Sequence, residues 1–403
     1  MDKLFQPVAT GRLTLANRIV RSATFEGLCD DDGRPTKAYL DLYAALAGQH
    51  IGALLTGFAY VTPCGRAMQP GQAGIEDDAK IPLYKTMTGL VHARGGKVLM
   101  QIAHSGRQTS ARAVGGWARG ASSQSSAYFG VKVKALTTSE AWALAEGFAT
   151  AALRCQKAGF DGVQIHAAHG YLVHQFLLPS INDRRDIFGI DRKTGIGPQF
   201  LKVIIERVRE RCGHDFPLWV KISGDDQPQH GLEGAPLIHL VRFLDQMKVD
   251  AIEISCGTME RALNIFRGQT VPLDAIWRYN PKYKTASILG RLWRRYVLYP
   301  FMRPGIRLFS PMYNLAYARQ AKQHTAIPII SVGGFRTGQE MSTAVERGAT
   351  DMVGLSRPFI SEPDLVDQLI ADHGWKAKCL NCNRCAVMTD SHQPTRCYRA
   401  VDV

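Results

Sequence analysis

Short apolar runs alternate with longer segments of helical periodicity along most of the 403-residue chain. Eight runs rich in Val and Ile are apolar on both parities, which is typical of parallel strands buried on both faces. These predicted strands are 19–24, 51–61, 97–104, 162–168, 217–224, 251–257, 328–334 and 352–358. Because helical patterns separate them, the sequence predicts an α/β fold, a (β/α)8 TIM barrel. The alternative is an open sheet with a small second domain, which would usually break the even spacing.

Two of the predicted helices have recognisable ends. The first begins with Ser139 as N-cap and Glu140 in its first turn, and it closes at Gly159. The second has Pro198 at its first helical position and runs toward Gly213. The sequence contains no G-x-G-x-x-G, Walker A, H-E-x-x-H or G-x-S-x-G motif, which argues against a Rossmann or P-loop site.

Two connections between the predicted strands are long. Residues 105–138 are rich in Gly, Ser and Ala, and we expect a loop that covers a substrate. Residues 258–316 separate the sixth and seventh strands, and they predict a capping subdomain on a barrel that spans 1–375. Within them, 277–307 carry eight Lys or Arg, seven aromatic residues and no Asp or Glu. Residues 376–403 form a Cys-rich C-terminal tail.

Composition and charge narrow the choice of protein class. With 45% hydrophobic and 21% charged residues, the chain is not disordered, collagen-like or coiled-coil. The net charge of +14 suggests an anionic partner, but without 277–307 the chain carries only +6. Since no nucleic-acid-binding motif accompanies the charge, we expect no nucleic-acid partner. Neither a signal peptide nor an 18-residue apolar run is present, so we expect a cytoplasmic protein.

Candidate chemistry gathers at the predicted carboxyl ends of the strands, where TIM barrels carry their sites. Lys221 could form a Schiff base, lie against an electron-rich cofactor ring, or reach the surface. His166 and His169 could ligate zinc or donate to a substrate oxygen with Tyr171 as general acid, or simply begin a helix. The glycines and the Ser-Arg pair after the last two strands suit a phosphate group, and they are Gly333, Gly334, Gly354, Ser356 and Arg357.

Several of these segments together resemble the old yellow enzyme family of FMN-dependent ene-reductases, near its 2,4-dienoyl-CoA reductase-like branch. The likeness runs from Leu4 to about Ile370. It is carried by LFQPVATGRLTLANRIVRSAT, GKVLMQIAHSGRQ, GFDGVQIHAAHGYLVHQFLLPSINDRRDIFG, VGGFRTGQE and GLSRPFISEPDL. Phe25 departs from the pattern, because relatives can place a flavin-tuning cysteine there.

The resemblance implies roles for individual residues. Lys221 would stabilise negative charge near N1 and O2 of the reduced flavin, and Gln101 would meet its pyrimidine edge. His166 and His169 would bind the substrate carbonyl oxygen, and Tyr171 would donate a proton. The remaining implied FMN contacts are Ala23, Thr24, Gly57, Gly333, Gly334, Gly354, Ser356 and Arg357.

The resemblance also implies the reaction. We expect hydride to pass from NADH or NADPH through FMN to an activated alkene, a small molecule, in an enzyme that forms a homo-oligomer. An amine dehydrogenase or demethylase on the same scaffold is one alternative. The other is a non-catalytic barrel that binds anions or membranes.

The tail and the insertion raise two separate questions. Cys379, Cys382, Cys385 and Cys397 have a spacing that could hold a [4Fe–4S] cluster or zinc, or they could be free thiols. Between the second and third cysteines, this spacing is one residue shorter than in the dienoyl-CoA reductase relatives. Residues 277–307 could be a solvated helical cap, a peripheral contact with anionic membranes, or a site for an anionic substrate tail such as a CoA phosphate.

Overall fold

Eight parallel strands close into a ring in the computed structural model, which describes residues 2–225, 232–284, 287–391 and 393–399. The ring closes because β13 pairs with β3 and β4 pairs with β6. Its strands are β3 (Ile19–Arg21), β4 (Ala53–Leu55), β6 (Val98–Ala103), β9 (Gly162–Ala167), β10 (Leu218–Ser223), β11 (Ala251–Ser255), β12 (Ile329–Val332) and β13 (Met352–Leu355). The predicted (β/α)8 barrel is therefore confirmed. The predicted strand 51–61 divides into β4 and the short β5 (Ala59–Tyr60).

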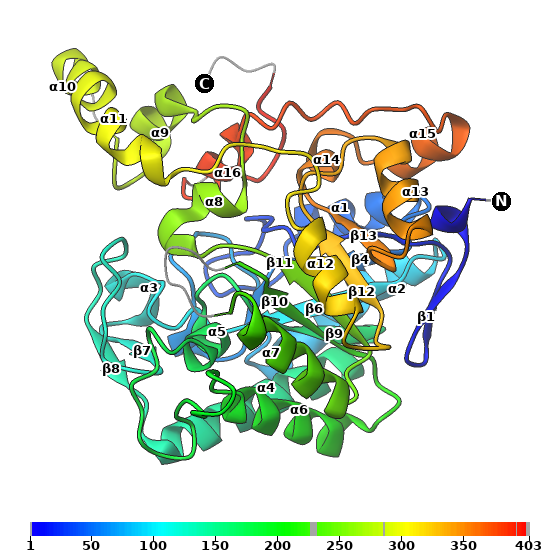
Figure 1. The fold of residues 1–403 in the computed structure, drawn as a ribbon, viewed down its shortest axis with the longest axis horizontal. Coiled ribbons are helices and arrows are strands. Elements are labelled where there is room, and N and C mark those ends of the chain that lie inside the picture. Colours follow the sequence, from blue (N-terminus) through cyan, green and yellow to red (C-terminus); the bar gives the residue numbers. More distant parts are fainter. Residues whose placement is uncertain (1, 226–231, 285–286, 392, 400–403) are drawn as a thin grey trace.

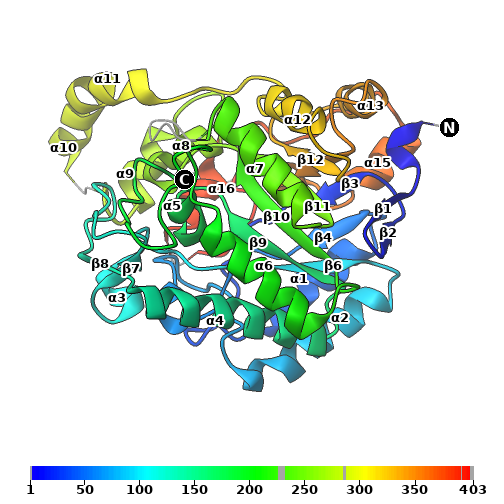
Figure 2. The same ribbon diagram turned by 60° about the horizontal axis from the view of Figure 1, so that its bottom comes forward.

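Helices cover the outside of the ring, as Figures 1 and 2 show. They are α1 (Lys37–Ala47), α2 (Ile81–His92), α4 (Thr138–Lys157), α6 (Gln199–Cys212), α7 (Ala235–Gln246), α12 (Leu315–Lys322), α13 (Gly338–Glu346), α14 (Arg357–Ser361) and α15 (Leu365–Ala371). Two predicted helix starts were wrong. Thr137, not Ser139, caps α4 in a reciprocal capping box with Glu140, and Pro198 is the N-cap of α6 rather than its first helical residue.

The inside of the barrel is layered, because alternate residues of each strand point inward. One buried cluster includes Val20, Leu55, Leu99, Trp219 and Ile330, and the β1–β2 hairpin (Val8–Thr10, Leu13–Leu15) contributes Leu13 and Leu15 to it. Two residues further along β6, β10 and β11, the inward positions become polar: Gln101, Lys221 and Glu253. The layering thus places a polar layer next to the buried apolar layer, toward the carboxyl ends of the strands.

Further elements extend from the carboxyl ends of the strands. After β6 come α3 (Ala111–Val114), β7 (Ala118–Gly120) and β8 (Val133–Ala135), and α5 (Leu172–Leu177) follows β9. The insertion after β11 contains α8 (Ala262–Ile265), α9 (Leu273–Tyr279), α10 (Ile288–Trp293), a π-helical segment (Arg294–Leu298) and α11 (Tyr299–Met302). The C-terminal tail folds back as α16 (Arg384–Met388), which lies beside this insertion in both views. Among the described residues, no helix is long and apolar enough to cross a membrane.

Candidate active site

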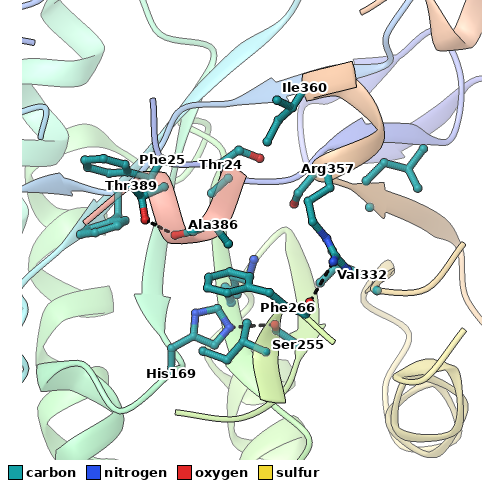
Figure 3. Close-up of a pocket in the computed structure, with 18 of the residues that line it drawn as sticks. Thr24, Phe25, His169, Ser255, Phe266, Val332, Arg357, Ile360, Ala386 and Thr389 are labelled. Atoms are coloured by element: carbon teal, nitrogen blue, oxygen red, sulfur yellow. Dashed lines mark hydrogen bonds between the residues drawn. The ribbon is translucent and has the colours of Figure 1, made fainter. Parts of the chain in front are cut away.

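A cavity lies at the carboxyl ends of the barrel strands, enclosing about 1220 Å³ of empty space with its opening included. Figure 3 shows part of its wall, with Thr24, Arg357 and Ile360 on one side and His169 and Ser255 on the other. All but one of the predicted site residues of the barrel line this cavity. They are Ala23, Thr24, Gln101, His166, His169, Tyr171, Lys221, Gly333, Gly334, Gly354, Ser356 and Arg357. Residues more than 330 positions apart in the chain therefore share one wall.

Gly57 is the exception, since it does not line the cavity. Its N–H donates to Glu26 Oε1 at 2.6 Å, and a Cβ at this position would lie 2.3 Å from Glu26 Oε2. The glycine therefore lets the chain pass close to a buried carboxylate. Its role in cofactor binding stays a prediction.

A hydrogen-bonded polar layer lies below the cavity. Gln101 Nε2 donates to Gln164 Oε1 at 2.7 Å, and Gln164 Nε2 donates to Glu253 Oε2 at 2.8 Å. Lys221 Nζ donates to Ser22 Oγ at 3.1 Å and pairs with Glu253 Oε1 at 3.4 Å. Strand register explains these contacts, because Gln101 stands opposite Gln164, and Lys221 stands opposite Glu253. The layer fixes the orientation of both side chains expected to meet the flavin ring.

The two histidines lie edge to face with each other at the end of β9, with ring centroids 4.9 Å apart. Burial lowers the pKa of both imidazoles well below the usual range, and the nearby Lys221 charge lowers them further. His169 Nε2 lies 2.8 Å from Ser255 Oγ, whereas buried His166 Nδ1 has no hydrogen-bond partner among the described residues. Both rings are thus neutral groups with hydrogen-bonding capacity at the cavity wall.

His169 takes a backbone conformation that few non-glycine residues adopt, with φ of 62°. In this conformation the His169 carbonyl accepts the N–H of Met259 at 2.9 Å. This contact joins the β9 and β11 ends of the barrel. The strained residue therefore anchors the start of the insertion next to the imidazole that faces the cavity.

Tyr171 completes this side of the cavity. The centroid of its ring lies 4.9 Å from that of His166, at an interplanar angle of 87°, and 5.2 Å from that of Phe58. The phenol ring therefore packs between these two rings. Burial and the nearby Asp390 carboxylate raise the pKa of Tyr171, which keeps the phenol protonated. A protonated phenol beside two neutral imidazoles can donate a proton to a bound substrate.

The opposite side of the cavity offers cationic and N–H donors. Gly333 and Gly334 have φ of 121° and 86°, and a Cβ on Gly334 would lie 2.5 Å from Met312 N. The N–H of Gly334 has no acceptor among the residues that the structure describes. Arg357 donates to the carbonyls of Phe266 (2.8 Å) and Arg267 (3.1 Å) and to Asn383, and no carboxylate of the described chain pairs with it. These groups fit a phosphate, and together with Gln101 and Lys221 they fit FMN.

Sequence reasoning missed several residues of the site. Glu253 was one, although a single acid within an apolar strand already signals a buried partner. Ser255, Phe266 and Tyr313 also line the cavity, and the tail contributes Ala386 and Thr389. No local signal places a tail residue above a distant barrel, so these two could be found only from the structure.

The four tail cysteines come close to one another. Cys379, Cys382, Cys385 and Cys397 line one small cavity beside Arg357, and all are free thiols. Burial raises the pKa of Cys385 to about 12, which disfavours its thiolate. Across the described residues, no group of three or more His, Cys, Asp or Glu side chains is placed to hold a metal ion. The thiols as arranged here do not fit a cluster or zinc, and the cluster stays a prediction.

Comparison with known proteins places the chain in a family. The profile described as NADH:flavin oxidoreductase / NADH oxidase family matches residues 3–267 and 308–373. A 4,4'-dithiodibutanoate disulfide reductase of Rhodococcus erythropolis is 27% identical, covering 98% of this chain and 94% of that protein. An NADPH dehydrogenase of Geobacillus thermodenitrificans is 32% identical over 71% of this chain and 82% of its own length.

Other relatives are longer than this chain. A cinnamate reductase of Clostridium sporogenes is 27% identical over 94% of this chain, which spans only 54% of that protein. Among solved structures, the old yellow enzyme homologue of Zymomonas mobilis has a TM-score of 0.71 at 22% identity, covering 94% of this chain and 96% of its own. The chain therefore belongs to the NADH:flavin oxidoreductase / NADH oxidase family, the old yellow enzyme family, and is an FMN-dependent oxidoreductase that uses NAD(P)H.

Proposed function

We propose that this enzyme reduces the C=C bond of α,β-unsaturated carbonyl compounds. The observation that carries the proposal is the group of His166, His169 and Tyr171 at one cavity wall, with both imidazoles held neutral by burial. When bound, FMN supplies the hydride that it has taken from NAD(P)H. Addition of hydride at the β-carbon of an enone moves negative charge to the carbonyl oxygen, and hydrogen-bond donors aimed at that oxygen lower the barrier.

The chain's own residues then have distinct tasks. His166 and His169 donate N–H groups to the carbonyl oxygen and polarise the alkene before and during transfer. Tyr171 gives its phenolic proton to the α-carbon, which balances the added hydride and completes the saturated carbonyl compound. Lys221 belongs to the polar layer below the cavity, where its charge would stabilise the reduced flavin.

The two half-reactions separate these roles. We expect the double variant His166→Ala/His169→Ala to retain FMN and to be reduced by NAD(P)H at a rate within a few-fold of wild type. Its oxidation by 2-cyclohexen-1-one should slow by about 10²–10³-fold, the effect of losing oxyanion donors. Stopped-flow absorbance of the flavin measures both steps. An equal loss of both half-reactions with FMN still bound would contradict the assignment.

The same assay tests two other substrate classes, amines and disulfides. An amine dehydrogenase or demethylase would bleach its flavin anaerobically with a secondary or tertiary amine and without NAD(P)H. The dithiodibutanoate reductase relative makes an aliphatic disulfide the second oxidant to test, beside the enone. If a disulfide or an amine reacts and no enone does, the proposal is wrong.

We also propose that residues 277–307 contact anionic membranes. Large apolar side chains of this segment are exposed, among them Ile288 (73%), Leu289 (77%), Tyr296 (70%) and Phe301 (82%). Eight Lys or Arg and no acidic residue accompany them, the composition of a helix that lies in a lipid interface. Figure 1 shows α10 and α11 projecting from the barrel at the upper left.

Flotation with vesicles tests the membrane contact. Wild type should float with phosphatidylserine-containing vesicles, and it should not float with pure phosphatidylcholine. Phe301→Ser with Leu289→Ser should weaken flotation strongly, because it removes the two most exposed apolar side chains of the segment. Leu83→Ser provides the matched control, since Leu83 is exposed (37%) on α2, outside the insertion. Equal binding to both lipids, or none, would refute the contact. The homo-oligomer and the cytoplasmic location stay predictions.

A further inference from the structure

A second cavity lies between the insertion and the C-terminal tail. It encloses about 1490 Å³ of empty space, its opening included. Residues of α8, α9, the π-helical segment and α11 form one side, and Ala386 and Val387 of α16 contribute to the other. Its apolar and aromatic lining includes Ala262, Leu263, Phe266, Val271, Leu273, Ile276, Trp277, Leu298, Tyr299, Phe301 and Ile306.

Much of the wall of this second cavity lies outside the part of the chain that the family profile matches. The family profile matches residues 3–267 and 308–373, so most of the insertion wall and all of the tail wall lie outside it. Hydrogen bonds join the insertion wall to the tail wall. Asp390 of the tail accepts from Asn280 of the insertion and from Gln69 of the barrel, each at 2.9 Å. Burial raises the pKa of Asp390, and the hydrogen bonds from Gln69 and Asn280 partly offset this by stabilising its carboxylate.

The second cavity adjoins the candidate active site. Met259, Phe266, Ala386 and Thr389 line both cavities, so their side chains form the partition. Figure 3 shows Phe266 between α16 and the paired His169 and Ser255. Two of the four partition side chains are small, and Met259 is unbranched and adaptable. A substrate held at His169 can therefore extend past this partition.

The polar groups of the second cavity indicate where an anion would lie. Both of its acids are engaged, because Glu260 pairs with Arg107 at 2.6 Å and Asp390 accepts two amide donors. Arg261 and Arg294 donate to the backbone carbonyls of Gly305 and Tyr283, and neither pairs with a carboxylate of the described chain. Two arginines without an acidic partner beside an apolar chamber suit a ligand with an apolar body and an anionic end.

We infer that the second cavity binds the body of an elongated substrate: a long apolar chain or ring system that ends in a carboxylate or another anion. The activated alkene lies at His166 and His169, the apolar body passes the partition, and the anion meets Arg261 or Arg294. The inference rests on the proposed function for the alkene end only. In this inference the insertion, together with the tail, selects the substrate by the length and charge of its body.

Binding of a saturated ligand tests the cavity without catalysis. Titration calorimetry of the FMN-loaded wild type with decanoate should show one site with a negative heat-capacity change. Ala262→Trp fills the second cavity from α8 and should abolish this binding. Ala111→Trp, the same substitution at an exposed position of α3, should leave it intact. Arg294→Gln should weaken decanoate by about 10-fold, from loss of a charge-assisted bond, and leave decanol unchanged.

A chain-length series tests its use in the reaction. The kcat/KM for 2-enals from six to twelve carbons should rise about three- to fourfold per methylene until the cavity is full. In Ala262→Trp this slope should disappear, whereas Ala111→Trp should keep it. Decanoate binding that is absent in wild type, or equally lost in both Trp variants, overturns the second cavity. If decanoate binds as expected but no 2-enal of any length is reduced, the cavity stands and the proposed function fails.

Discussion

Replacing Glu253 by Gln removes the negative charge from the polar layer beneath the candidate active site while keeping the side chain's size. Glu253 is fully buried, pairs with Lys221 Nζ at 3.4 Å, and accepts hydrogen bonds from Ser22 Oγ and Gln164 Nε2. The Gln amide can still accept from one of these donors. Lys221, however, loses its only ion-pair partner in the described chain. The substitution therefore tests whether the Glu253 carboxylate balances the charge of Lys221.

The expected magnitude follows from the geometry. Two unit charges 3.4 Å apart attract by about 5 kcal/mol at an effective dielectric constant of 20. Removing one partner of a buried pair costs about 3–5 kcal/mol, because the other charge stays buried. For a chain of 403 residues, about 3 kcal/mol corresponds to a drop in Tm of about 3–4 °C. With FMN bound, the unbalanced lysine should favour the negatively charged reduced flavin and raise its two-electron midpoint potential by about 30–60 mV.

Two measurements and one control decide the matter. Thermal unfolding gives Tm, and anaerobic titration against redox dyes gives the midpoint potential. Asp250→Asn breaks a comparable pair with Arg209 (2.8 Å), but Asp250 precedes β11 at the opposite end of the barrel. It should lower Tm without moving the potential. A Glu253→Gln enzyme with a lowered Tm and an unchanged or lowered potential would refute the reasoning about charge.

Four further predictions concern single groups. Tyr171→Phe should slow flavin oxidation by an enone about 10²-fold and leave reduction by NAD(P)H unchanged in stopped-flow experiments, and equal rates would exclude the phenol as proton donor. Burial lowers the pKa of His104 and His174 to about 3, so below pH 6.5 the unfolded chain binds more protons. Each of these two histidines should then lower the free energy of unfolding by about 1.4 kcal/mol for every pH unit below about 6.5. Chemical denaturation at about pH 7.5 and 5.5 measures this loss. Thr137→Ala removes the capping box of α4 and should cost about 1 kcal/mol in the same assay, whereas Ser139→Ala should not. Arg357→Gln should weaken FMN binding about 10–100-fold by fluorescence titration, and unchanged affinity would remove Arg357 from the phosphate site.

The sequence predicted the barrel and the residues that line its cavity because both follow from strand periodicity. Parallel strands end at one edge of a barrel, so a polar residue at a strand end reaches the common site wherever it lies in the chain. His166 and Lys221 are examples, since strand register places them side by side. Glu253 follows the same logic. Its inward parity and its position opposite Lys221 were readable once the strands were aligned.

Helix ends were less predictable because several nearby residues compete for one cap. Thr137, Thr138 and Ser139 can each accept an N–H. Thr137 is the N-cap because it stands three residues before Glu140, whose carboxylate accepts the N–H of Thr137 at 2.8 Å. The spacing T-x-x-E, from Thr137 to Glu140, is the sequence signal for this capping box.

The insertion and the tail show where local patterns stop being informative. Nothing in the local sequence of α9 or α16 indicates that the two helices lie beside the same cavity. Their placement depends on a few long-range contacts, such as the bond of Asn280 to Asp390, 110 positions apart in the chain. These contacts join segments that the family profile does not match. We therefore expect the barrel to supply the flavin site, and we infer that substrate choice depends on the insertion and the tail, the two segments whose position the local sequence predicts least.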